Sequence, residues 1–154
     1  MDRQEQAGGQ GAELESIIRF LESSLQRDIN LVREILLAIE ASSYPDLSSL
    51  FTKLGQGQRS FQDPVCYHVK MLVEEAGLLS AIDAKSFDGP YWLRIELTWA
   101  GHEFVDAVRD SEVWKAAKSG VQAAGGFSLD LLAAVAKGLL KKKIEQHTGI
   151  TVDI

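Results

Sequence analysis

Residues 91–97 alternate between apolar and polar side chains, and this pattern limits most strongly what the chain can fold into. The apolar set is Tyr91, Leu93, Ile95 and Leu97, and the residues between them are Trp92, Arg94 and Glu96. A period of two predicts a half-buried antiparallel strand, with Trp92 pointing away from the apolar face. Residues 78–84 predict the partner strand, and Asp88-Gly89 within residues 85–90 predicts the turn. The chain is therefore expected to contain a β-hairpin.

The segments before this hairpin follow the helical period instead. Residues that can cap a helix precede three of them, at Asp28, Asp46 and Asp63. Proline follows Asp63 at the first helical position, and Gly77 is well placed to end that third helix. Three helices followed by a hairpin are the element order of a winged helix-turn-helix. Residues 28–110 are predicted to form this domain, with residues 64–76 as its recognition helix and residues 85–90 as the tip of its wing.

Further helices are predicted on both sides of this domain. Residues 1–11 are polar and glycine-rich and are predicted to be disordered. Residues 12–27 predict an amphipathic helix whose apolar face consists of Leu14, Ile17, Ile18, Leu21 and Leu25. After the hairpin, Thr98 can cap one helix, and Ser111 and Ser128 can cap a C-terminal helical pair in residues 111–154. The predicted fold class is mainly α with a small β-hairpin: a winged helix-turn-helix core with an N-terminal helix and two C-terminal helices.

The length of the chain and its cysteine content fit one domain in a reducing compartment. At 154 residues the chain can bury a core without a staple, and its single cysteine, Cys66, excludes an internal disulfide. The first residues lack the apolar core of a secretory signal. The longest apolar stretch, near residues 129–140, is too short for a membrane span, which takes about 20 residues. The predicted location is the cytoplasm, with no membrane span.

Two short patterns are similar to bacterial winged-helix repressors. They are Tyr67-His68-Val69-x-x-Leu72 followed by Ala76-Gly77-Leu78-Leu79, and Leu97-Thr98-x-x-Gly101. The chain resembles more closely an uncharacterised bacterial and phage family, a domain of unknown function with a winged-helix core. This resemblance is carried by residues 27–37, by Tyr67-His68-Val69, by Ala76-Gly77-Leu78 and above all by Leu97-Thr98-Trp99-Ala100-Gly101-His102-Glu103-Phe104. It covers about residues 27–140 and implies the fold and a phage, prophage or mobile-element setting, but no mechanism.

This chain departs from the family pattern in two places. Residues 1–26 precede the point where the pattern starts. Glu74-Glu75 adds one residue before Ala76-Gly77, which shifts the phase of the helix exit.

The sequence carries no signature of catalysis, so the protein is predicted to be non-enzymatic and to need no cofactor. Cys66 and His68, with His102 elsewhere, are residue types that bind zinc. Their spacing fits no zinc finger, and on a helix Cys66 and His68 point about 200° apart, so no metal site is predicted. His102-Glu103 is a possible acid–base pair, but a structural role near a helix start is favoured.

Two kinds of partner remain open. A DNA-binding regulator, acting as a dimer on double-stranded DNA, would use the recognition helix, the wing and the loop before them. The predicted nucleic-acid-binding residues are Arg59, Asp63, Tyr67, His68, Lys70, Lys85 and Arg94. Phosphate neutralisation needs Lys and Arg, yet residues 28–110 hold seven of these against thirteen Asp and Glu. The alternative is a protein-interaction module on an acidic winged-helix scaffold, with Tyr67, Phe87 or Trp92 as aromatic anchors.

The two ends of the chain also leave alternatives open. The apolar face of residues 12–27 can pack on its own domain or form the interface of a homodimer, although it spans fewer heptads than a free-standing coiled coil needs. Near the C-terminus the cationic residues are Lys137, Lys141, Lys142 and Lys143. These lysines can suit an anionic membrane surface, but a favourable position at a helix C-terminus is the preferred interpretation.

Overall fold

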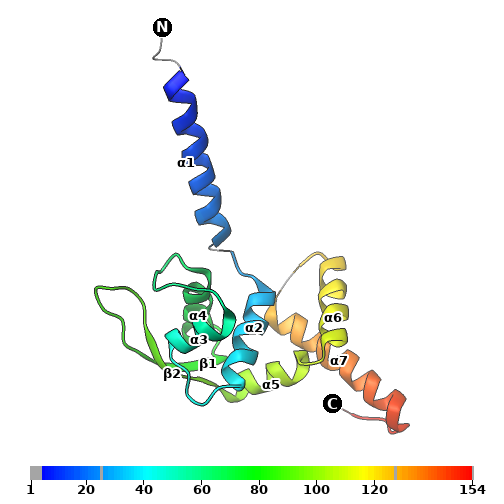
Figure 1. Cartoon of the computed structure of the whole chain (residues 1–154). Coiled ribbons are helices and arrows are strands. Elements are labelled where there is room, and N and C mark those ends of the chain that lie inside the picture. The colour runs from blue at the N-terminus through cyan, green and yellow to red at the C-terminus, as the bar shows by residue number, and fades with distance from the viewer. Residues whose placement is uncertain (1–4, 25, 127, 154) are drawn as a thin grey trace. The chain divides into compact units, whose positions relative to one another are not determined.

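The computed structural model describes residues 5–24, 26–126 and 128–153; the side chains of residues 5–8 and 20–24 lie outside this description. Within the described residues the chain is mainly helical, with seven helices and a two-stranded antiparallel hairpin (Figure 1). This confirms the predicted fold class, mainly α with a small β-hairpin. The chain divides into two compact units, one up to Glu96 and one from Leu97 onward.

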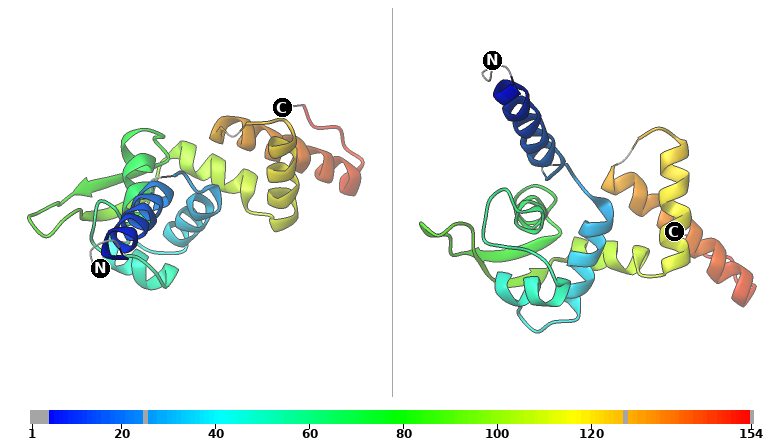
Figure 2. Two further views of the ribbon diagram at one scale, coloured as in Figure 1. Left: turned by 90° about the horizontal axis from the view of Figure 1, so that it is seen from above. Right: turned by 45° about the horizontal axis from the view of Figure 1, so that its top comes forward.

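The elements of the first unit are α1 (Glu5–Ser24), α2 (Ile29–Glu40), α3 (Leu47–Leu54), α4 (Pro64–Glu74), β1 (Leu79–Asp83) and β2 (Trp92–Leu97), the last of which reaches the boundary. Those of the second unit are α5 (Trp99–Val108), α6 (Ser111–Ala123) and α7 (Leu129–Thr148). β1 and β2 lie side by side in both views of Figure 2, and together they form the only sheet in the described part of the chain.

Helix α1 is longer at its start than the sequence predicts. It begins at Glu5, within the segment that was expected to be disordered, and it ends at Ser24. Each glycine in the first turns costs about 1 kcal/mol relative to alanine. The Glu, Gln and Ala residues around these glycines are good helix formers, and extending an existing helix adds one hydrogen bond for each residue fixed. The boundary predicted at residue 12 is therefore wrong. The predicted interface residue Leu25 lies outside the described residues.

The three predicted aspartate caps are confirmed. Asp28 Oδ1 accepts from the Asn30 amide at 2.9 Å and begins α2. Asp46 forms a reciprocal capping box with Ser49 at the start of α3. Asp63 Oδ1 accepts from the amides of Val65 and Cys66 and begins α4. These bonds satisfy amides that have no partner within their helix, and thereby fix where each helix starts.

The apolar alternation of the second strand is interrupted at Arg94. This residue has φ +49°, which breaks the two-residue period. As a result Trp92 and Ile95, three positions apart, are both buried, whereas Leu93 and Arg94 between them are exposed. The Ile95 amide donates to Pro45 O at 2.8 Å, so this edge of β2 is tied to the α2–α3 connection. The prediction that Trp92 points away from the core is therefore wrong.

The second unit is built around α7. Leu132 and Ala136 of α7 are completely buried, as is Ala117 of α6. Asp110, and not Ser111 as predicted, caps α6 by accepting from the amides of Glu112 and Val113. The Asp110 carboxylate caps the helix in place of the Ser111 hydroxyl because it also accepts a hydrogen bond from Lys143 Nζ at 2.6 Å.

The lysines near the C-terminus are partly engaged inside this unit. The hydrogen bond from Lys143 lowers the pKa of Asp110 to about 2, and the same bond raises the pKa of Lys143. Lys137 lies 3.6 Å from Glu103. Of the helices described, none has the length and apolar character needed to cross a membrane.

Candidate binding surfaces

Two of the residues predicted to bind nucleic acid are buried. Asp63 and His68 expose only 7% and 1% of their surface. Asp63 uses one oxygen to cap α4 and the other to accept from the Gln58 amide at 3.0 Å. The assignment of both side chains to a DNA-contacting face is therefore wrong, because the hydrogen bonds that cap α4 and hold Gln58 direct the carboxylate of Asp63 into the protein.

His68 joins two helices inside the first unit. Its Nε2 accepts from the Asp28 amide at 2.8 Å, and its Nδ1 lies 2.6 Å from Pro64 O. Because a carbonyl oxygen can only accept, Nδ1 carries the proton and the ring is neutral. The imidazole thereby connects the start of α4 to the start of α2, across 40 residues of sequence.

Arg59 holds the loop before α4 against the loop of the hairpin, residues 85–90. Its guanidinium donates to Pro90 O and to Ser86 Oγ, both at 3.3 Å, and lies 4.8 Å from the centre of the Tyr91 ring. The Tyr91 hydroxyl donates in turn to Asp46 Oδ2 at 2.9 Å. Arg59 is exposed, but much of its donor capacity is directed at the protein and not at solvent.

The remaining predicted residues on α4 and the wing offer little positive charge. Tyr67 is half-buried, with its ring edge-on to His68. Lys70 is exposed on α4, with Glu74 one helical turn further along. Lys85 lies 3.3 Å from Asp83 in an exposed ion pair. The α4 and wing surface is therefore close to neutral where DNA binding would need a cluster of cations.

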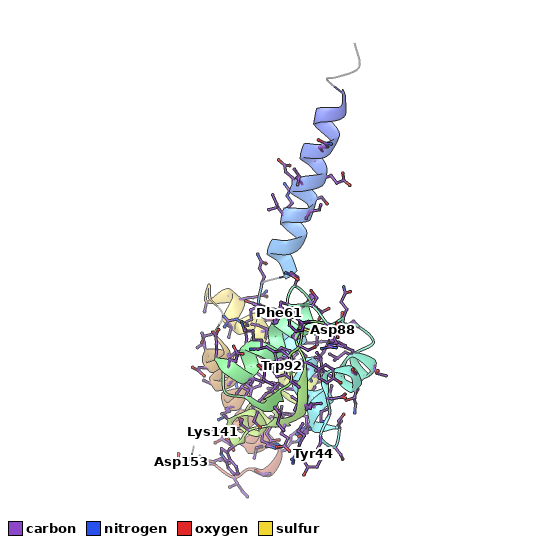
Figure 3. The ribbon with its side chains drawn as sticks, turned by 90° about the vertical axis from the view of Figure 1, so that its left-hand side faces the viewer. Tyr44, Phe61, Asp88, Trp92, Lys141 and Asp153 are labelled. Carbon is purple, nitrogen blue, oxygen red and sulfur yellow. The ribbon has the colours of Figure 1, made fainter. Side chains whose placement is uncertain are left out.

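Arg94 belongs to a different surface, a groove between the α2–α3 connection and the hairpin. The groove has a volume of about 530 Å³. It is lined by Ser42, Ser43, Tyr44, Pro45, Asp46, Ser49, Ile82, Leu93 and Arg94, and is called the Tyr44–Arg94 groove below. In Figure 3, Tyr44 lies well away from Phe61 and Asp88, which mark the loop before α4 and the wing tip. The groove is thus separate from the predicted DNA-binding face.

The side chains of the groove combine apolar area with one cation. Tyr44 and Ile82 expose 63% and 53% of their surface, and Leu93 is also exposed. The Arg94 guanidinium lies 5.1 Å from the centre of the Tyr44 ring and forms an exposed ion pair with Glu96 at 3.9 Å, a distance too long for a hydrogen bond. The carboxylate of Asp46 accepts from the Ser49 amide and from Tyr91, so its oxygens are engaged. Arg94 therefore offers N–H donors beside an apolar wall.

The backbone at Tyr44 and Arg94 is strained. Among the described residues these are the non-glycine residues with positive φ, both at +49°, and their side chains contact each other. A left-handed conformation costs a non-glycine residue about 1–2 kcal/mol. Strain of this kind concentrates at functional sites, where the surrounding structure maintains it. The two strained residues therefore mark the groove as a candidate site.

The strain at Arg94 predicts an unusual order of stabilities. Both Arg94→Gly and Arg94→Ala remove the guanidinium, so they differ only in the backbone. Glycine adopts φ +49° without strain, and we expect the glycine variant to be more stable than the alanine variant by about 1 kcal/mol. In an ordinary strand the order is reversed, since glycine is less stable than alanine by about 0.5–1 kcal/mol. Urea unfolding of the two variants measures the difference, and the ordinary order would contradict a left-handed Arg94.

The residue types that suggested a metal serve the core. Cys66 is buried, its Sγ donates to Gln58 O at 3.4 Å, and burial raises the pKa of its thiol to about 11. His68 has both ring nitrogens engaged in the bonds described above. Across the described part of the chain, no three His, Cys, Asp or Glu side chains are grouped so that they could hold a metal ion.

The structure defines a mainly helical first unit with a small hairpin and a second unit of helices, and the sequence is similar to those of other proteins. Residues 26–128 match the family model of hypothetical proteins designated DUF2513, and the chain belongs to this family. An uncharacterized protein of Haemophilus influenzae (strain ATCC 51907 / DSM 11121 / KW20 / Rd) is 32% identical over 122 residues, which cover 78% of this chain and 99% of that protein. No solved structure matches the chain.

Proposed function

We propose that this protein is a non-enzymatic protein-binding module on a winged-helix scaffold, and that the Tyr44–Arg94 groove is its contact surface. The observation that carries the proposal is the strained Tyr44–Arg94 pair beside the exposed side chains of Ile82 and Leu93. Exposed apolar area next to a cation on a fixed backbone is suited to anchoring a partner's side chain. The winged-helix assignment rests on the order of three helices and a hairpin.

The chemistry of the groove defines the segment that it would accept. Ile82 and Leu93 would cover an apolar side chain of the partner, and the ring of Tyr44 would extend this contact. The free edge of the Arg94 guanidinium would donate to a carboxylate or a carbonyl oxygen next to it. The expected partner is a protein segment that presents an apolar side chain beside an oxygen acceptor.

Binding to double-stranded DNA stays a prediction, and the charges of this face give it less support. Arg59 donates to backbone and hydroxyl oxygens of the hairpin, and Lys85 is paired with Asp83. Affinity for DNA comes largely from Lys and Arg side chains that neutralise phosphates. The phage or mobile-element setting likewise stays a prediction from the resemblance.

The test compares two apolar residues of the hairpin. The full chain is used to capture proteins from the cells that make it, and each captured protein is then purified and its affinity measured. We expect Ile82→Asp and Arg94→Gly each to weaken binding at least tenfold, the cost of about 1.4 kcal/mol in binding free energy. Phe87→Ser is the matched control, because Phe87 is fully exposed at the wing tip and outside the groove.

The same comparison can overturn the proposal. All variants must first show the same far-UV circular dichroism as the original chain. A captured protein that binds Ile82→Asp and Arg94→Gly as tightly as the original chain would exclude the groove as the contact surface. A chain that captures no protein and instead binds duplex DNA in a salt-sensitive manner would show that the function is nucleic-acid binding.

A further inference from the structure

Helix α1 presents an apolar stripe to solvent. Leu14, Ile17 and Ile18 expose 59%, 49% and 50% of their surface. By helical spacing these three positions fall within about 100° of arc, so they lie on one face of the helix. Apolar area that is exposed along one side of a helix is suited to contact with another protein surface.

Carboxylates lie on both sides of this stripe. Glu13 and Glu15 are exposed, and each lies about 100° around the helix from the centre of the stripe, in opposite directions. Glu13 also lines a hollow of about 260 Å³ together with Leu14 and Ile17. Arg19 lies about 150° from the centre, on the far side of the helix. Two such stripes would bring like charges together, so the stripe favours a partner surface that is apolar and cationic.

A groove with these properties lies in the second unit, between α6 and α7. It has a volume of about 430 Å³ and is called the α6–α7 groove below. Its lining consists of Glu112, Val113, Ala116, Leu139, Lys142, Lys143, Gln146 and His147. The apolar part of this lining comes from both helices, with Val113 and Ala116 on α6 and Leu139 on α7.

The charges of the α6–α7 groove are mainly positive. Lys143 donates to Asp110 at 2.6 Å and lies 3.9 Å from Glu112, so its charge is engaged within the unit. Lys142 and His147 are exposed, and neither forms an ion pair with another of the described residues. A carboxylate that entered the groove would therefore meet an ammonium group and an imidazole that are free to bind it.

We propose that α1 of one copy binds in the α6–α7 groove of a second copy, with its apolar stripe against the apolar lining and its carboxylates toward Lys142 and His147. Each copy carries both surfaces, so the contact can form twice between two copies. This inference is independent of the proposed function, because neither surface contributes a residue to the Tyr44–Arg94 groove. Both α1 and α7 also lie outside residues 26–128, the stretch that matches the DUF2513 family.

The first test is the solution mass of the full chain across micromolar concentrations, by analytical ultracentrifugation. We expect the mass to rise above that of a monomer, and Ile17→Ser to weaken the association at least tenfold. Ile82→Ser is the matched control and should leave the association unchanged, because Ile82 is similarly exposed and lies outside both surfaces. A chain that stays monomeric throughout, or equal weakening by both variants, would overturn the proposal.

The second test reverses the charges of each surface separately. The flank variant carries Glu13→Lys and Glu15→Lys, and the groove variant carries Lys142→Glu and His147→Glu. Each places like charges together in the contact, so we expect each alone to associate at least tenfold more weakly than the original chain. In an equimolar mixture, α1 of either variant meets a groove of opposite charge on the other, and the association should recover.

Two single reversals provide the controls for this test. Arg19→Glu changes a charge on the far side of α1, and Lys115→Glu changes an exposed charge of α6 outside the groove. Neither should weaken the association, and all variants must first show the far-UV circular dichroism of the original chain. A groove variant that associates as tightly as the original chain would exclude the α6–α7 groove as the partner surface. A mixture that fails to recover would overturn the pairing of the two surfaces.

Discussion

Replacing Trp92 with alanine is expected to lower the free energy of unfolding of the first unit by about 3–5 kcal/mol. The indole is buried where β2 meets the core, and its removal both exposes apolar area and leaves a cavity. Urea unfolding followed by far-UV circular dichroism measures the loss. The measurement also decides between two registers, since regular alternation along residues 91–97 would place this side chain in solvent.

A second tryptophan provides the control for this prediction. Trp99, at the start of α5, is 81% exposed. Its replacement by alanine should change stability by no more than about 0.5 kcal/mol, as is usual for surface substitutions. If Trp92→Ala were equally mild, β2 would have the regular alternation, and Arg94 would have no left-handed break to explain.

The second large effect is expected at His68. Replacing it with alanine removes the acceptor of the Asp28 amide and the donor to Pro64 O, and an unsatisfied buried group costs about 1–3 kcal/mol. The space left by the ring adds to this cost, since the side chain is almost completely buried. Thermal unfolding of the variant should show a clearly lower midpoint.

His102 is the matched control, because it is exposed on α5 and carries the same side chain. His102→Ala should leave the midpoint nearly unchanged. The nucleic-acid interpretation of His68 makes the opposite prediction, namely unchanged stability with weaker DNA binding. That result would contradict the buried position described above.

The local features of the fold could be predicted from the sequence, because they depend on neighbouring residues. Asp28, Asp46 and Asp63 each cap the helix that follows directly, and the turn predicted within residues 85–90 lies at Phe87-Asp88, between the paired residues Ser86 and Gly89. At α6 the observed cap lies one residue before the predicted one. Asp110 caps this helix in place of Ser111 because it also binds Lys143, 33 residues further along the chain.

The candidate site could not be predicted in the same way. The groove is formed by residues of the α2–α3 connection and the hairpin that are far apart in sequence. Its strain at Tyr44 and Arg94 is a backbone property with no compositional signal, since neither residue is a glycine. Tyr44-Pro45 indicated only the end of a helix. The burial of His68 could not be predicted either, because its hydrogen-bond partner, the Asp28 amide, comes from the start of another helix.

The binding of the full chain to a random DNA duplex tests most directly whether the partner is a protein or DNA. Binding is measured by fluorescence anisotropy at about 50 mM and 200 mM salt. Phosphate contacts lose much of their affinity between these two concentrations. A protein partner predicts no binding to the duplex at either concentration, because the cations of the α4 and wing surface are few or engaged. Tight binding at the lower salt that is lost at the higher salt, and weakened by Lys70→Glu, would contradict it.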